Sequence, residues 1–88
     1  MSWTVELAPG AARTLRKMDP QMSRRLRRVL GAIEQLQDPR QRGKALTGTL
    51  RGLWRYRVGD YRIICDLVDS QLIVLVIEIG HRGSIYED

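Results

Sequence analysis

Hydrophobic and polar residues follow two different rhythms along the 88-residue chain. Residues 3–7 (WTVEL) alternate with a period of two, which predicts a short strand. Pro9 suits the first turn of a helix, because that position needs no backbone N–H donor. We expect this first helix over residues 11–18, with Leu15 and Met18 facing inward.

A second, longer helix is predicted after Asp19-Pro20. The residue before a proline avoids helical backbone angles, so the first helix should stop there. Pro20 can then open the next helix with Asp19 as its N-cap. Apolar residues recur at helical spacing and form one stripe, made of Met22, Leu26, Val29, Leu30, Ile33 and Leu36. Asp38-Pro39 should end this helix, and the two helices together predict a helical hairpin packed on a sheet.

The second half of the chain has the pattern of a β-meander. Residues 40–52 are polar and contain three glycines, which predicts a loop. Strand-like runs follow over residues 53–58, 61–68 and 72–79, with tight turns expected at Gly59-Asp60 and Asp69-Ser70. The prediction is a single α+β domain over residues 1–88, in the order β-α-α-β-β-β, with the hairpin on an antiparallel sheet.

The hairpin register brings three arginines together. If Gly59-Asp60 is a two-residue loop, Arg57 faces Arg62 and Arg55 faces Ile64. Opposed residues share a face of a sheet, so the three arginines emerge on one side. The other side carries Trp54, Tyr56, Val58, Tyr61, Ile63, Cys65 and Leu67. The helices should cover this apolar side, with Cys65, Trp54 and Tyr61 as core residues, and leave the arginines on the open side.

Two interpretations of the arginine cluster remain open. Like charges directly opposed disfavour a sheet, and a local rule broken without structural gain indicates a functional site. Guanidinium groups bind phosphate bidentately, so one interpretation is a phosphate site. The other is a solvated sheet face, whose arginines pair with Asp66, Glu87 or Asp88.

Composition narrows the classes of protein. The single cysteine excludes a disulfide framework, and one histidine with one cysteine does not make a four-ligand zinc site. We expect neither a metal nor a cofactor. No segment has the pattern of a signal peptide, and the longest apolar run, residues 72–77, is too short for a bilayer. These features predict a soluble, cytoplasmic chain without membrane contact.

The charge pattern favours a polyanionic partner. The net charge is +5, and thirteen of the fifteen cations are arginines. Residues 13–28 hold seven cations and one anion, as do residues 40–62, so each stretch carries +6. Residues 63–88 hold five anions and one cation, Arg82, which gives −4. Nucleic acid is the first expectation for the partner and an acidic protein the second.

Two segments resemble a known family. Residues 50–64, LRGLWRYRVGDYRII, resemble the core of RelE/ParE-type toxins of bacterial and archaeal toxin–antitoxin modules. Residues 79–86, IGHRGSIY, look like the terminal motif of the same toxins, and Lys44-Ala45-Leu46 fits the lead-in. The resemblance is strong over residues 40–88, and the β-α-α order of residues 1–39 fits the family fold.

The resemblance implies a site. In the RelE branch, the toxins are ribosome-dependent mRNA endonucleases; in the ParE branch, they poison DNA gyrase. The RelE-type pattern has basic residues on the middle strands, an arginine after the last strand and a tail tyrosine. The positions that match it are Arg55, Arg57, Arg62, Arg82 and Tyr86. His81 stands where some relatives have lysine, and Lys44 and Arg51 join the expected RNA-binding set.

RNA cleavage of this type uses the ribose 2′-hydroxyl as nucleophile, so it needs a base, an acid and stabilisation of a phosphorane-like dianion. Guanidinium stabilises that charge but is a poor base. We expect Arg62 and Arg82 to bind the scissile phosphate. His81 and Tyr86 are the candidates for proton transfer, since imidazole exchanges protons near neutral pH and nearby cations lower the pKa of a phenol. Which residue is the base stays open.

Further expectations concern partners. Arg24, Arg25, Arg27 and Arg28 form either a solvated helix face or a contact with ribosomal RNA. The family implies a RelB-like antitoxin whose acidic segment wraps the toxin, in a complex that binds operator DNA through the antitoxin. The function predicted is a type II toxin that cleaves translated mRNA. The alternatives are a ParE-like gyrase poison and an inert relative that only binds RNA or antitoxin.

Overall fold

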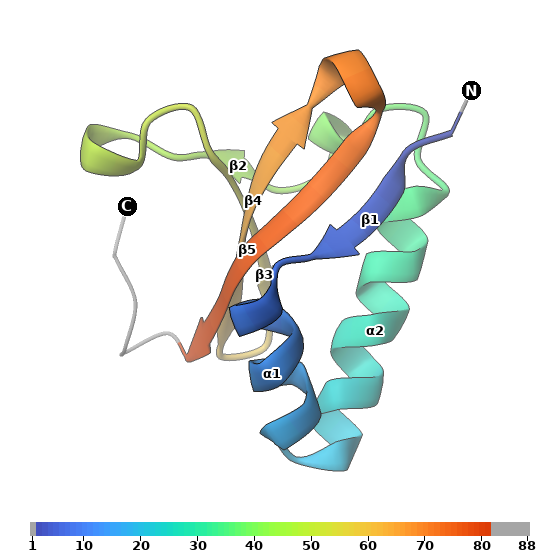
Figure 1. Cartoon of the computed structure of the whole chain (residues 1–88), viewed down its shortest axis with the longest axis vertical. Coiled ribbons are helices and arrows are strands. Elements are labelled where there is room, and N and C mark those ends of the chain that lie inside the picture. The colour runs from blue at the N-terminus through green and yellow to red at the C-terminus, as the bar shows by residue number, and fades with distance from the viewer. Residues whose placement is uncertain (1, 82–88) are drawn as a thin grey trace.

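Both helices begin at a proline, as expected. In the computed structural model, which describes residues 2–81, α1 spans Pro9–Lys17 and α2 spans Pro20–Glu34 (Figure 1). The Asp19 carboxylate caps α2 by accepting a 3.1 Å hydrogen bond from the backbone N–H of Met22. The helix ends before the predicted stop at Asp38-Pro39, because the N–H groups of residues 35 and 36 bond to carbonyls three positions back and tighten the last turn.

The apolar stripe of α2 becomes part of the core. Leu26, Leu30 and Ile33 are buried, and α1 adds Ala11 and Leu15. The helices pack on one face of a sheet, where α1 contacts β1 and β5 and α2 contacts β1 and β3. The strands are β1 (Thr4–Leu7), β2 (Lys44–Ala45), β3 (Trp54–Val58), β4 (Tyr61–Val68) and β5 (Ile73–His81).

The sheet has the order β1-β5-β4-β3-β2 and is mixed (Figure 1). The meander β3-β4-β5 is antiparallel, as predicted. The first strand lies at the edge but runs parallel to β5, with Thr4 opposite Ile73 and Leu7 opposite Val76. Alternation in residues 3–7 determines which side chains are buried but carries no information on direction. The α+β architecture with a helical hairpin is confirmed, with this change to the sheet.

Residues 40–52, predicted to be a loop, contain the short strand β2 and two 3-10 helices, η1 (Pro39–Gln41) and η2 (Gly48–Leu50). Side chains of β3 anchor this segment. The buried Tyr56 hydroxyl donates a 2.7 Å hydrogen bond to the Pro39 carbonyl. The Trp54 indole N–H donates one of 2.8 Å to the Arg42 carbonyl. Because these donors lie far along the chain, local composition did not reveal the strand.

The connection between β4 and β5 is longer than the predicted tight turn at Asp69-Ser70. A 3-10 helix, η3 (Asp69–Gln71), is followed by Leu72 in left-handed conformation (φ +55°), so β5 begins at Ile73. Arg40 holds this turn against η1 with hydrogen bonds of 3.0 and 2.7 Å to the Asp69 carboxylate. The hydrogen bonds from Arg40 lower the pKa of Asp69 below its ordinary value.

No helix within residues 2–81 is both long enough and apolar enough to cross a membrane. The same part of the chain holds no cluster of three or more histidine, cysteine or acidic side chains that is arranged to bind a metal ion.

Candidate nucleic-acid interface

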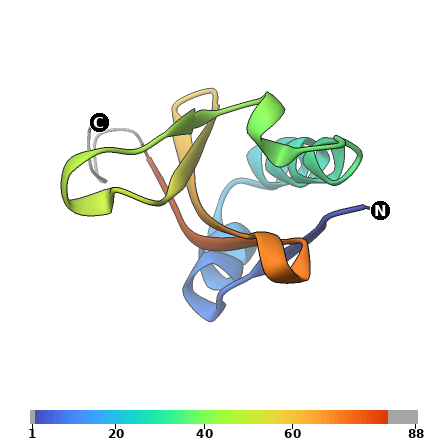
Figure 2. The same ribbon diagram turned by 90° about the horizontal axis from the view of Figure 1, so that it is seen from above.

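The register of the β3–β4 hairpin is the predicted one. Arg57 lies opposite Arg62, and Arg55 lies opposite Ile64. The additional strand β2 places Lys44 opposite Arg55. Directly opposed residues share a face, so Lys44, Arg55, Arg57 and Arg62 lie together on the side of the sheet away from the helices. We call this group of four residues the cationic face. In Figure 2, α2 lies on one side of the twisted sheet and the loop with η2 projects on the other.

Side chains of the cationic face belong to two rows that cross the strands. The rows are Arg57–Arg62–Gly80 and Lys44–Arg55–Ile64–Glu78. Four cations and one carboxylate give these rows a net charge of +3. Gly80 has no side chain, so Arg62 has a bulky neighbour in its row only on the β3 side. The arrangement concentrates positive charge over the middle of the sheet, which favours binding of a polyanion.

The three arginines differ in exposure, and Arg62 is not open to solvent as we expected. Arg57 is exposed and Arg55 is half-buried, but only 3% of Arg62 is exposed. Ile64, the next residue of β4 on this face, is also only 3% exposed and lies outside the main core cluster. Strand β4 therefore has shielding on its outer face as well as on its helix face. Arg62 is therefore an inward-held cation beside the exposed Arg57.

His81 is not brought to the cationic face. It lies opposite Tyr61 at the end of β5, and the two rings meet edge-on with centroids 5.4 Å apart. Tyr61 packs against the main core, so His81 is on the helix side of the sheet. Arg82 and Tyr86 lie outside the described residues.

A residue that the sequence prediction missed does reach the cationic face. The β4–β5 ladder shifts register between Ile64 and Cys65, so that Ile64 faces Glu78 and Cys65 faces Val76. Ile77 is the extra residue of this β-bulge and is exposed. The bulge turns the exposed Glu78 onto the face of Ile64 and Arg55. A signal was present, since strict alternation from Val76 would have placed this carboxylate in the core.

Comparisons with known proteins decide the family. Residues 5–86 match the family described as the ParE toxin of the type II toxin–antitoxin system parDE. The chain belongs to this family. It is a type II toxin of the RelE/ParE superfamily. The toxin is similar to Toxin RelG of Mycobacterium tuberculosis H37Rv, with 29% identity over 92 residues and 98% of each chain covered.

Two solved structures with the same fold are toxin–antitoxin complexes. The toxin is similar to the RelBE2 complex of M. tuberculosis, with a TM-score of 0.82, 26% identity and coverage of 96% of this chain and 95% of that one. It is similar in fold to the archaeal RelE–RelB complex of Pyrococcus horikoshii OT3, with a TM-score of 0.73 and 24% identity. That alignment covers 97% of the toxin and 100% of the archaeal chain. The fold prediction made from the resemblance is therefore confirmed.

The helix arginines form a separate basic surface of the toxin. Arg24, Arg25, Arg27 and Arg28 are all exposed on α2, as their position off the apolar stripe predicts. They lie on the helix side of the sheet and are not brought together with the cationic face. Arg51, expected to bind RNA, is exposed directly after η2. The toxin thus presents cations on two sides of its sheet.

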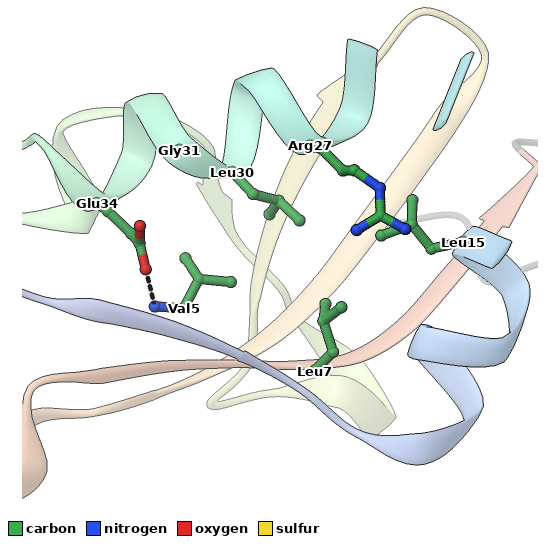
Figure 3. A pocket seen from close by; sticks show the side chains of 7 residues that line it. All are labelled: Val5, Leu7, Leu15, Arg27, Leu30, Gly31 and Glu34. Atoms are coloured by element: carbon green, nitrogen blue, oxygen red, sulfur yellow. Dashed lines mark hydrogen bonds between the residues drawn. The ribbon is translucent and has the colours of Figure 1, made fainter. Parts of the chain in front are cut away.

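An aliphatic cleft of about 260 Å³ lies between α1, α2 and β1 (Figure 3). It is lined by Val5, Leu7, Leu15, Arg27, Leu30, Gly31 and Glu34. The Glu34 carboxylate accepts a 2.7 Å hydrogen bond from the Val5 N–H and so protects part of the free edge of β1. A mostly aliphatic lining suits an apolar group and not a phosphate. The cleft is therefore distinct from the cationic face, with which it shares no residue.

Core positions of the meander are confirmed. Cys65 is fully buried, and burial raises the pKa of its thiol to about 12, so the thiol is a structural hydrophobic group and not a nucleophile. Trp54 and Tyr61 are partly buried and pack against the core cluster, as predicted.

Proposed function

We propose that the toxin is a ribosome-dependent endoribonuclease that cleaves translated mRNA and so inhibits translation. The observation that carries the proposal is the cationic face, on which Arg57 and Arg62 oppose one another beside Arg55 and Lys44. Such a cluster costs stability in the free protein, and an RNA phosphate relieves the repulsion. Membership of the toxin family and the similarity to RelG support a toxin function.

In this proposal the role of each arginine depends on how exposed it is. Arg62, held in a buried position, and Arg82 contact the scissile phosphate and stabilise the charge that develops on it. The exposed Arg57, with Arg55, Lys44 and Arg51, orients the RNA backbone. Tyr86 stacks on a base or takes part in proton transfer, whereas His81 lies on the other side of the sheet. The ribosome places the nucleophile in line with the leaving group, which supplies much of the rate.

We further propose that a RelB-like antitoxin inhibits the toxin. Both solved relatives described above are complexes with such a partner. An acidic segment that folds on binding would neutralise the cationic face and block access to phosphate. In this proposal residues 1–88 act as a single cytoplasmic domain, and the toxin–antitoxin complex binds operator DNA through the antitoxin.

Primer extension on a translated mRNA, after induction of the toxin alone, tests the proposal. We expect cleavage at codons occupied by ribosomes and none on free RNA. Arg62→Ala should abolish it, whereas Arg13→Gln, which removes an exposed helix arginine of α1, should not. A DNA supercoiling assay run in parallel separates the alternatives. Inhibition of supercoiling without RNA cleavage would identify a gyrase poison, and neither effect would identify an inert relative.

A further inference from the structure

One acidic side chain lies within the two rows of the cationic face. Glu78 is exposed and occupies the row of Arg55 and Lys44, diagonal to Arg62. Opposed residues of antiparallel strands have Cβ atoms roughly 5 Å apart and diagonal ones roughly 7 Å. The side chains of Glu78 and Arg62 are therefore close enough to contact the same nucleotide. Among the side chains of residues 2–81, Glu78 forms no ion pair.

The placement of Glu78 depends on the β-bulge. Val74 and Val76 are fully buried in the core, so a regular strand would direct residue 78 to the core as well. The bulge restores burial at Ile79 and turns Glu78 outward, but it leaves Ile77, a large aliphatic residue, 37% exposed. Exposure of Ile77 is a cost to stability that accompanies the burial of Ile79 and the outward turn of Glu78. Bulges occur next to active sites, where they redirect one side chain, and here that side chain is a carboxylate.

The cationic face otherwise holds no carboxylate or imidazole among the described residues. Its other members are three guanidinium groups, which are poor bases, and the exposed ammonium group of Lys44 on the edge strand β2. His81 lies across the sheet, edge-on to Tyr61. Asp66 is half-buried one row further from Arg62, opposite Leu75. Asp60 is exposed as well but lies in the turn between β3 and β4, so Glu78 is the exposed carboxylate within the rows of the arginines.

We propose that Glu78 is the general base of the cleavage reaction, an assignment that rests on the proposed function. Its carboxylate accepts the proton of the ribose 2′-hydroxyl as the 2′-oxygen bonds to phosphorus. The bond from phosphorus to the 5′-oxygen breaks, and the leaving oxygen takes a proton from water. The products are a 2′,3′-cyclic phosphate and a 5′-hydroxyl. Glu78 then releases its proton to solvent, so no oxidant, metal or co-reactant is consumed.

Glu78→Gln tests the assignment on ribosomes that carry a defined mRNA. The amide keeps the size of the side chain but accepts no proton at working pH. General acid–base catalysis contributes typically 10²–10⁴-fold, so we expect single-turnover cleavage to slow by about 100-fold or more. Binding to the ribosome and the midpoint of urea unfolding should stay at wild-type values. Glu6→Gln is the matched control, since it also removes one exposed carboxylate from a strand of this sheet, and it should cleave normally.

A second substrate tests whether Glu78 acts as a general base or as a general acid. Sulfur in place of the bridging 5′-oxygen leaves as a thiolate without a proton, so loss of an acid no longer matters, whereas loss of a base still does. We expect the defect of Glu78→Gln to persist on this substrate. Recovery of the rate there, or wild-type cleavage of the normal mRNA by Glu78→Gln, would overturn the assignment alone. Absence of cleavage by the wild-type toxin would overturn the proposed function together with it.

Discussion

Arg57 and Arg62 lie directly opposite one another across β3 and β4. One of these guanidinium groups is exposed and the other is almost completely buried. Their mutual repulsion cannot be relieved by rotation of both side chains into solvent, because only 3% of Arg62 is exposed. The pair is therefore a built-in cost to stability that an anion can offset.

The first prediction concerns this cost. Arg57→Gln should raise the free energy of unfolding by roughly 0.2–1 kcal/mol, because one member of an opposed like-charge pair is removed. The same variant should cleave ribosome-bound mRNA more slowly. Urea denaturation and primer extension measure the two effects. Arg13→Gln, on the exposed face of α1, is the control and should leave both near wild type. A less stable Arg57→Gln protein would show that repulsion between Arg57 and Arg62 does not destabilise the fold.

The register of this pair was predictable because the Gly59-Asp60 loop leaves the two strands no alternative alignment. Burial of Arg62 was not predictable in the same way. Alternation places Arg62 on the polar face of β4, and no local pattern indicates that this face is covered as well. Sequence alternation reports which side of a strand is apolar, but not what later covers the polar side.

The direction of β1 and the bulge in β5 also differ from the sequence prediction, for similar reasons. A two-residue period is the same for a parallel and an antiparallel neighbour, so the direction of β1 was not encoded in residues 3–7. A bulge adds one residue without changing composition, so Glu78 was assigned no role although its place in the alternation pointed to an irregular strand. The chemistry of the arginines was readable from sequence, because it needs only the hairpin register.

A second prediction concerns Gly43, which directly precedes β2. Gly43 has φ +81°, and a Cβ there would lie 2.4 Å from the Arg55 carbonyl oxygen. Gly43→Ala should therefore lower the free energy of unfolding by roughly 1–3 kcal/mol and weaken RNA binding, because Lys44 and Arg55 lose their pairing.

Gly48 provides the matched control for this substitution. Its φ is +67°, but a Cβ there would meet no atom within 4 Å. Gly48→Ala should cost roughly 1–2 kcal/mol from the backbone alone and leave RNA binding unchanged. Denaturation and a filter-binding assay on both variants check this. Equal effects on RNA binding would show that close packing at residue 43 does not support the cationic face.

The third prediction concerns alkaline pH. Burial raises the pKa of Cys65 from 9.0 to about 12, so above pH 9 the folded state keeps a proton that the unfolded chain releases. The stability that this provides is complete below pH 9 and is lost as pH rises towards 12. Each such group contributes a slope of at most about 1.4 kcal/mol per pH unit. Burial also raises the pKa of Tyr56 above its ordinary 10.0, which adds to the loss at higher pH.

Urea denaturation between pH 8 and 10.5 measures this loss. Cys65→Ala should be less stable at pH 8, because it leaves a small cavity, yet its stability should fall less steeply between pH 9 and 10. Tyr56→Phe should retain the wild-type slope in that interval, since the tyrosine titrates later. Parallel curves for wild type and Cys65→Ala would mean that the thiol is accessible to solvent in the folded state.

The last prediction concerns the second basic surface, on α2. If the helix arginines contact ribosomal RNA, the double variant Arg24→Glu, Arg28→Glu should bind ribosomes more weakly, with a smaller loss of affinity as salt rises. Each phosphate contact removed lowers the slope of log affinity against log salt by roughly 0.7–0.9, so two lost contacts give roughly 1.4–1.8. Both side chains are exposed and lie off the buried stripe, so the fold and the cationic face should be unaffected. Affinity measured at several salt concentrations, with Arg13→Glu as the control on α1, tests this. A double variant with the wild-type affinity and slope would assign these arginines to a solvated helix face and leave the cationic face as the toxin's RNA contact.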